Sequence, residues 1–153
     1  MALTRDQVVA RARSMAQPGF TISYLLGAGG MKPNDPTPGG SCDCSGFVAW
    51  CYGISRKLDH PHYREWNGGW LETTAVEKDA RSTLGFFDEV PRELALPGDA
   101  IVFGDRGPKK QGHIGIVTKV EKRGPLLVCH CSKGNHVRYG SAIQETGPDI
   151  FWA

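Results

Sequence analysis

Residues 42–51 read C-D-C-S-G-F-V-A-W-C, so three cysteines fall within ten residues. This stretch follows a loop rich in glycine and proline, M-K-P-N-D-P-T-P-G-G at residues 31–40, and it continues into an apolar run. The pattern predicts a helix that begins near Cys44 and extends to about Tyr52. Gly53 would end the helix, since glycine readily adopts the left-handed conformation of a C-terminal cap. Cys44 is therefore expected in the first turn.

A cysteine in the first turn of a helix is well placed to act as a nucleophile. Free backbone N–H groups and the positive end of the helix dipole stabilise a thiolate, so we expect the pKa of the Cys44 thiol to be lowered. The same N–H groups could bind the oxyanion of a tetrahedral intermediate. Ser45 and Gly46 follow, and their small side chains leave room for a substrate. Asp43 is expected to cap the helix.

The last third of the chain offers a general base for this nucleophile. Residues 100–103, 113–120 and 126–130 are short β-rich runs separated by turn-forming segments, which predicts an antiparallel sheet. His113 begins the second run and His130 ends the third. In an antiparallel pair the start of one strand lies beside the end of the next, so the two histidines are expected to be neighbours. Cys44, His113 and His130 would supply a nucleophile, a base and an orienting group.

The rest of the sequence fits one α+β domain over residues 1–153. Thr4 and Gln7 form a capping box before a first helix, which Pro18 and Gly19 end. A further helix is predicted at about 73–81, and residues 24–40 are expected to form an irregular surface loop. Helices that precede strands along the chain are typical of α+β domains with an antiparallel sheet.

Four motifs together resemble the NlpC/P60 family of papain-like cysteine peptidases, which cut stem peptides of bacterial cell walls. The motifs are D-C-S-G-F-V at 43–48, P-G-D at 97–99, G-H-I-G-I-V at 112–117 and H-C-S at 130–132. An upstream segment, Y-L-L-G-A-G-G at 24–30, is similar to the family's Tyr-x-x-Gly-Gly sequence at the entrance of the site. The resemblance implies a papain-like NlpC/P60 fold, in which N-terminal helices pack on a central antiparallel sheet.

The same resemblance implies the roles of individual residues. Cys44 would be the nucleophile, His113 the general base and His130 the residue that orients His113. Tyr24, Asp43 and Ser45 would line the substrate site. No metal or other cofactor is implied, and the substrate would be a peptidoglycan or muropeptide stem peptide, cut at a γ-D-glutamyl linkage.

Three alternatives remain open from the sequence. An acyl or amide transferase could use the same thioester chemistry. A non-catalytic zinc or binding module could use C-D-C at 42–44 and C-H-C at 129–131, although Cys129 and Cys131 should lie on the opposite strand face from His130. A disulfide between Cys42 and either Cys131 or Cys44 could inactivate the site.

Charge and hydropathy restrict the partners and the location. The formal net charge of +2 is too small to indicate nucleic-acid binding, and no apolar run reaches the length of a membrane span. The N-terminal residues show no signal-peptide core. The resemblance implies action on the cell wall, in the periplasm or outside the cell, and without a visible signal we expect non-classical delivery, a trimmed form or association with a phage particle. The sequence does not identify any protein inhibitor or delivery partner.

Overall fold

The computed structural model describes residues 3–66, 68–83 and 85–152. The chain is α+β, as the sequence predicts. Its elements, in chain order, are α1 (Arg5–Met15), β1 (Ser23–Tyr24), β2 (Ser41–Cys42), α2 (Cys44–Tyr52), α3 (Pro61–Glu65), α4 (Thr73–Ala80), the 3₁₀ helix η1 (Arg92–Leu94), β3 (Ala100–Phe103), β4 (His113–Glu121), β5 (Gly124–Cys131), α5 (Lys133–Tyr139), β6 (Ile143–Thr146) and α6 (Asp149–Trp152). Within the described ranges, no helix is long and apolar enough to span a membrane.

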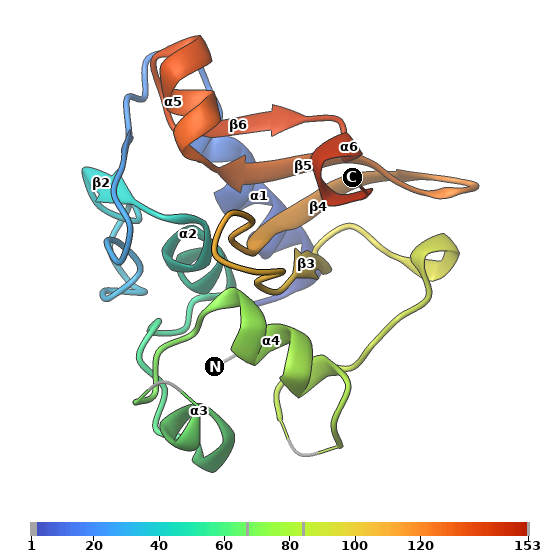
Figure 1. Ribbon diagram of the computed structural model, residues 1–153. Helices are drawn as coiled ribbons and strands as arrows, with labels where there is room; N and C mark the ends of the chain where they lie inside the picture. The colour runs from blue at the N-terminus through green and yellow to red at the C-terminus, as the bar shows by residue number, and fades with distance from the viewer. Residues whose placement is uncertain (1–2, 67, 84, 153) are drawn as a thin grey trace.

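A four-stranded antiparallel sheet in the order β3-β4-β5-β6 divides the apolar interior into two parts. Ile114, Ile116 and Cys129 pack with α1 and α2 on one face of the sheet. On the other face, Val117 and Val128 pack with Phe151 of α6. In Figure 1, α1 lies behind the sheet, α2 lies beside the start of β4, and α6 lies in front of β5. The start of α2 and the start of β4 are thereby brought together.

The predicted N-terminal helices are confirmed, together with their caps. Thr4 accepts a hydrogen bond from the backbone N–H of Gln7, and the Gln7 side chain accepts one from the N–H of Thr4. The second helix begins at Cys44 and ends at Gly53, whose φ of 72° is left-handed. All of its residues from Cys44 to Cys51 are buried, so the helix passes through the interior instead of lying on it.

Several short elements were not predicted, and each depends on contacts that are distant in sequence. Strand β6 exists because it pairs with β5, in the register His130 to Gln144 and Cys131 to Ile143. The loop expected at 24–40 is bounded by a parallel pair, in which Ser23 lies opposite Ser41. Helices α3, α5 and α6 have five, seven and four residues, too few for a hydrophobic period to reveal them.

The loop between β1 and β2 is fixed against the first turn of α2. The N–H of Asp43 donates to the carbonyl of Ala28 at 3.0 Å, and the N–H of Arg56 donates to the carbonyl of Gly30 at 3.0 Å. Gly30 has a φ of +77°, and a Cβ built there would lie 2.3 Å from the carbonyl oxygen of Gly46. The loop backbone therefore approaches the helix as closely as two glycines allow.

Gly30→Ala should destabilise the fold by about 2–4 kcal/mol, because it adds both left-handed strain and a backbone clash. Gly40→Ala is the matched control, since its Cβ would meet no atom within 4 Å, and it should change the stability by less than about 1 kcal/mol. Urea unfolding of both variants measures the difference. Equal unfolding midpoints would contradict the close packing of this loop.

Candidate active site

Asp43 organises the backbone around the candidate nucleophile. Its side chain caps α2 by accepting from the N–H of Gly46 at 2.9 Å, which confirms the predicted cap. Its second carboxylate oxygen accepts from the N–H of Gly27 at 2.8 Å, in the loop that follows β1. The carboxylate thus joins two segments that are separated in sequence, and its oxygens are engaged within the protein instead of facing a substrate.

The same carboxylate forms a buried ion pair with Arg56. The two guanidinium nitrogens of Arg56 lie 2.8 and 3.1 Å from the two Asp43 oxygens. The side chains are only 4% and 5% exposed, so both charges are withdrawn from water. Arg56 also donates to the carbonyl of Ala28 at 2.8 Å and lies over the ring of Trp70 at 4.9 Å. The sequence did not indicate Arg56, because a single arginine in a loop carries no motif.

The thiol of Cys44 lies at the meeting point of α2 and β4. The backbone N–H groups of Ile114 and Ser45 are directed at the thiol, and the Ser45 hydroxyl lies 3.9 Å from the sulfur. Ile114 follows His113 directly in β4. The structure therefore places the predicted nucleophile beside the backbone of the predicted base.

The expectation of a lowered thiol pKa was wrong. Burial raises the pKa of Cys44 to about 11, and the neighbouring carboxylate of Asp43 raises it further. The hydrogen bonds from Ser45 and Ile114 oppose these effects but do not outweigh them. Desolvation disfavours a charged sulfur more strongly than the helix terminus favours it. The resting side chain is therefore a neutral thiol.

The two predicted histidines are neighbours, as expected. The Nε2 atom of His113 lies 2.8 Å from the Nδ1 atom of His130, and both rings are buried. Burial lowers the pKa of His113 to about 3, with the adjacent His130 contributing, and burial lowers the pKa of His130 to about 4. Both imidazoles are therefore neutral near pH 7.

Two residues beyond the predicted set complete this cluster. Phe151 of α6 stacks on His113, with ring centroids 5.1 Å apart and an interplanar angle of 21°. The hydroxyl of Thr146, the last residue of β6, lies 2.8 Å from the Nε2 atom of His130. Neither residue belongs to a recognisable motif, and both reach the histidines through elements that were not predicted. Thr146 could have been identified as a partner of His130 only if the pairing register of β5 and β6 had been known.

Tyr24 and Ser45 both lie close to the thiol. Burial raises the pKa of Tyr24 to about 12, and the charges that Cys44 and Asp43 would carry raise it as well. The Tyr24 hydroxyl therefore remains protonated and able to donate a hydrogen bond. Ser45 is only 4% exposed, which leaves little of its surface for contact with a substrate.

All five cysteines are free thiols, and all are buried. The Cys131 thiol donates to the carbonyl of Cys42 at 3.3 Å, and the two side chains are in contact. Cys129 and Cys131 pack in the core on the face covered by α1 and α2, whereas His130 contacts Phe151 on the other face. Among the described residues, no group of three or more His, Cys, Asp or Glu side chains is arranged to hold a metal ion.

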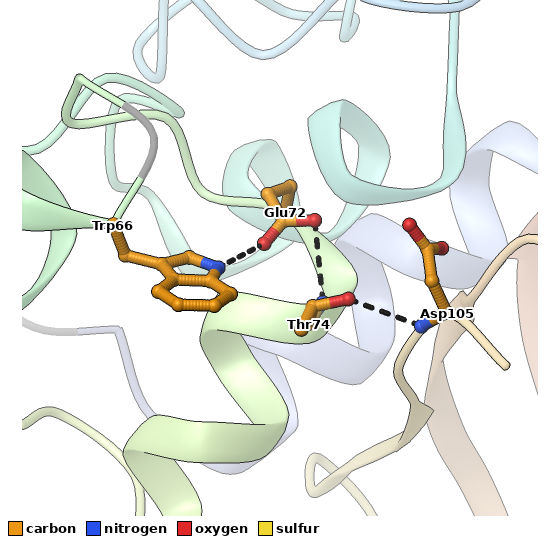
Figure 2. Close-up of a pocket in the computed structure, with 4 residues that line it drawn as sticks. All are labelled: Trp66, Glu72, Thr74 and Asp105. Carbon is orange, nitrogen blue, oxygen red and sulfur yellow. Dashed lines mark hydrogen bonds between the residues drawn. The ribbon is translucent and has the colours of Figure 1, made fainter. Parts of the chain in front are cut away.

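An open pocket of about 540 Å³ lies beside α4 and is lined by Trp66, Glu72, Thr74 and Asp105. Figure 2 shows that Glu72 accepts from the Trp66 indole and that Thr74 accepts from the N–H of Asp105. The Asp105 side chain in turn accepts from the N–H of Gly112 at 2.6 Å. The pocket contains none of the predicted catalytic residues. The hydrogen bond between Asp105 and Gly112 links the wall of the pocket to the residue before His113.

A helix that begins with a buried cysteine packs against an antiparallel sheet that carries paired histidines, which is the arrangement expected of papain-like cysteine hydrolases. A family model, the CHAP domain, matches residues 34–135, about two thirds of the chain. The chain therefore belongs to the CHAP domain family. CHAP domains are typically cysteine- and histidine-dependent amidohydrolases or peptidases and are related to the NlpC/P60 peptidases, so the resemblance seen in the motifs is confirmed. A search of curated proteins found no match.

Arg56→Met should lower the free energy of unfolding by about 3–5 kcal/mol, because it leaves the Asp43 carboxylate buried without its partner. Arg64→Met is the matched control. Arg64 forms an ion pair with Asp59 at 3.0 Å, in which the side chains are 59% and 88% exposed. Loss of that pair should cost no more than about 1 kcal/mol. Similar losses in the two variants, measured by denaturant unfolding, would show that the buried pair does not support the site.

Proposed function

We propose that this CHAP domain hydrolyses an amide bond in the stem peptide of peptidoglycan, through a thioester on Cys44. Its family membership supports a peptidoglycan hydrolase or amidase. The observation that carries the proposal is the arrangement of three groups from α2, β4 and β5. The Cys44 thiol contacts the Ile114 N–H, and His113 precedes Ile114 and is bonded to His130.

The first half of the reaction begins with a neutral thiol and a neutral imidazole. As the Cys44 sulfur attacks the carbonyl carbon, its proton passes to His113, so the free thiolate does not accumulate. The N–H of Cys44 lies in the first turn of α2, where amides lack intrahelical acceptors, and it can stabilise the oxyanion. The His113 imidazolium then protonates the leaving amine, the C–N bond breaks, and a thioester remains.

The second half of the reaction uses water in place of the thiol. His113, neutral again, accepts a proton from water as the hydroxide attacks the thioester carbonyl. The C–S bond then breaks, the proton returns to the Cys44 sulfur, and a carboxylic acid is released. His130 stabilises each imidazolium by accepting from its Nε2–H. The Tyr24 hydroxyl, which stays protonated, is proposed to donate a hydrogen bond to the substrate.

The finer specificity that we propose is a γ-D-glutamyl linkage, from the resemblance of the motifs to those of the NlpC/P60 family. Action would take place on the cell wall, outside the cytoplasm, after delivery by a route that the sequence does not identify. Catalysis would use the side chains of the chain itself. A transferase on the same scaffold would differ only in the acceptor that receives the acyl group.

Digestion of purified peptidoglycan sacculi, followed by mass spectrometry of the released fragments, tests this function. Wild type should release stem-peptide fragments whose masses name the bond, whereas Cys44→Ala should reduce the rate at least about a thousandfold, because the nucleophile is lost. Cys51→Ala, on the same helix, is the matched control and should retain activity. Equal release by wild type and Cys44→Ala would overturn the assignment of the nucleophile.

Added amines separate the hydrolase from the transferase. A hydrolase should release free carboxylates even with millimolar D-alanine present, because water reaches the thioester. Products that carry the added amine in preference to a carboxylate would instead establish transfer.

Because the Cys44 thiol and the His113 imidazole are both neutral at rest, the proposal also predicts an unusual dependence of activity on pH. The pKa of His113 is lowered to about 3 and that of Cys44 is raised to about 11, so the neutral base and thiol coexist between these values. The ratio kcat/KM should therefore stay level from about pH 5 to 9 and fall only at lower pH, as His113 becomes protonated. Circular dichroism at each pH separates this effect from unfolding. An acid limb near 6.5, the usual histidine pKa, would contradict the neutral pair.

A further inference from the structure

His130 makes hydrogen bonds through both of its ring nitrogens. Its Nδ1 atom lies 2.8 Å from Nε2 of His113, and its Nε2 atom lies 2.8 Å from the hydroxyl oxygen of Thr146. The sheet sets this arrangement, because His130 lies opposite Gln144 and Val128 lies opposite Thr146. Thr146 is therefore on the same face as His130, one diagonal step along the neighbouring strand.

The position of one proton follows from the other contact of Thr146. Its hydroxyl lies 2.9 Å from the carbonyl oxygen of Gly147, an atom that can only accept. A hydroxyl has one proton, so when Thr146 donates it to Gly147 the hydroxyl oxygen accepts from Nε2 of His130. His130 then carries its proton on Nε2 and presents a lone pair on Nδ1.

The same reasoning extends to His113. Because Nδ1 of His130 is an acceptor, Nε2 of His113 must be the donor in the bond between the two rings. Neutral His113 therefore carries its only proton on Nε2, and its Nδ1 lone pair is free to act as a base. When His113 gains a second proton during catalysis, the Nε2–H still meets an acceptor and not another donor.

We infer that Thr146 is a positioning residue that fixes the tautomers of both histidines and so prepares His113 as the base. Thr146 acts through His130 and does not itself touch the reacting atoms. It lies outside residues 34–135, the part matched by the CHAP family model. The inference deepens the proposed function and rests on it for its effect on activity, but the tautomers are a property of the resting protein.

The buried surroundings of the two histidines leave few groups that could replace the Thr146 hydroxyl as the acceptor for His130. His113 and His130 are 8% and 3% exposed, and Phe151 covers both rings, stacked on His113 and edge-on to His130. If Thr146 loses its hydroxyl, the proton of His130 can move to Nδ1. Nε2 of His113 would then have to accept a hydrogen bond from this Nδ1–H. His113 would then carry its own proton on Nδ1 and could no longer accept the proton of the thiol there.

The test compares Thr146→Val, which keeps the shape but removes the hydroxyl, with Thr146→Ser, which keeps the hydroxyl. Thr21→Val is the matched control, since Thr21 is exposed and distant in sequence from the histidines. Two-bond ¹H–¹⁵N NMR spectra of protein labelled with ¹⁵N-histidine, recorded at pH 7, report the protonated nitrogen of each ring. The rate of stem-peptide release is measured on the same samples.

Wild type, Thr146→Ser and Thr21→Val should show both rings protonated on Nε2. In Thr146→Val, His130 should populate the Nδ1–H form, and kcat should fall about ten- to a hundredfold with KM little changed, by analogy with the partners that orient metal-bound histidines. Thr146→Ser should keep kcat within about threefold of wild type.

Two results would overturn the inference. One is an Nδ1–H tautomer for His130 in the wild type, and the other is a folded Thr146→Val variant with wild-type tautomers. The NMR arm separates this outcome from failure of the proposed function. A tautomer change without stem-peptide cleavage by any variant would support the role of Thr146 while rejecting the substrate.

Discussion

The buried ion pair between Asp43 and Arg56 is the interaction on which the site depends. It joins the loop after β1, the first turn of α2 and the segment after that helix, so it fixes where the helix begins. Two desolvated charges are costly unless their hydrogen bonds are satisfied, and here both carboxylate oxygens have N–H donors from the backbone and from Arg56. Burial and this carboxylate both raise the pKa of the adjacent Cys44 thiol, so the residue that caps α2 also favours the protonated form of the proposed nucleophile.

The opposite half of the site derives its geometry from the sheet. Strands β4, β5 and β6 bring His113, His130 and Thr146 into one hydrogen-bonded row, and Phe151 packs against both histidine rings. The partner of one ring nitrogen fixes which nitrogen of each neutral histidine carries the proton. The low pKa values of the buried histidines and the high pKa of the buried thiol fit the proposed mechanism, in which proton transfer would accompany the attack on the substrate.

What could be predicted from the sequence was the part encoded in local patterns. Asp43, Cys44 and Gly53 mark the bounds of α2 through capping chemistry, and the apolar run after His113 marks β4. The roles of Thr146, Phe151 and Arg56 depend on strand register and on contacts between distant segments, which no local period encodes. The thiol pKa was wrongly predicted for the same reason, because its burial follows from packing between α2 and β4 and not from its place in the helix.

Trapping the covalent intermediate tests the central claim most directly. Wild-type protein is mixed with a purified muropeptide, quenched with acid at short times and digested for peptide mapping by mass spectrometry. We predict an acyl group on the peptide that contains Cys44, labile to hydroxylamine as a thioester is, with the other four cysteines unmodified. Release of product with Cys44 unmodified at every quench time, or an acyl group on another cysteine, would contradict the account.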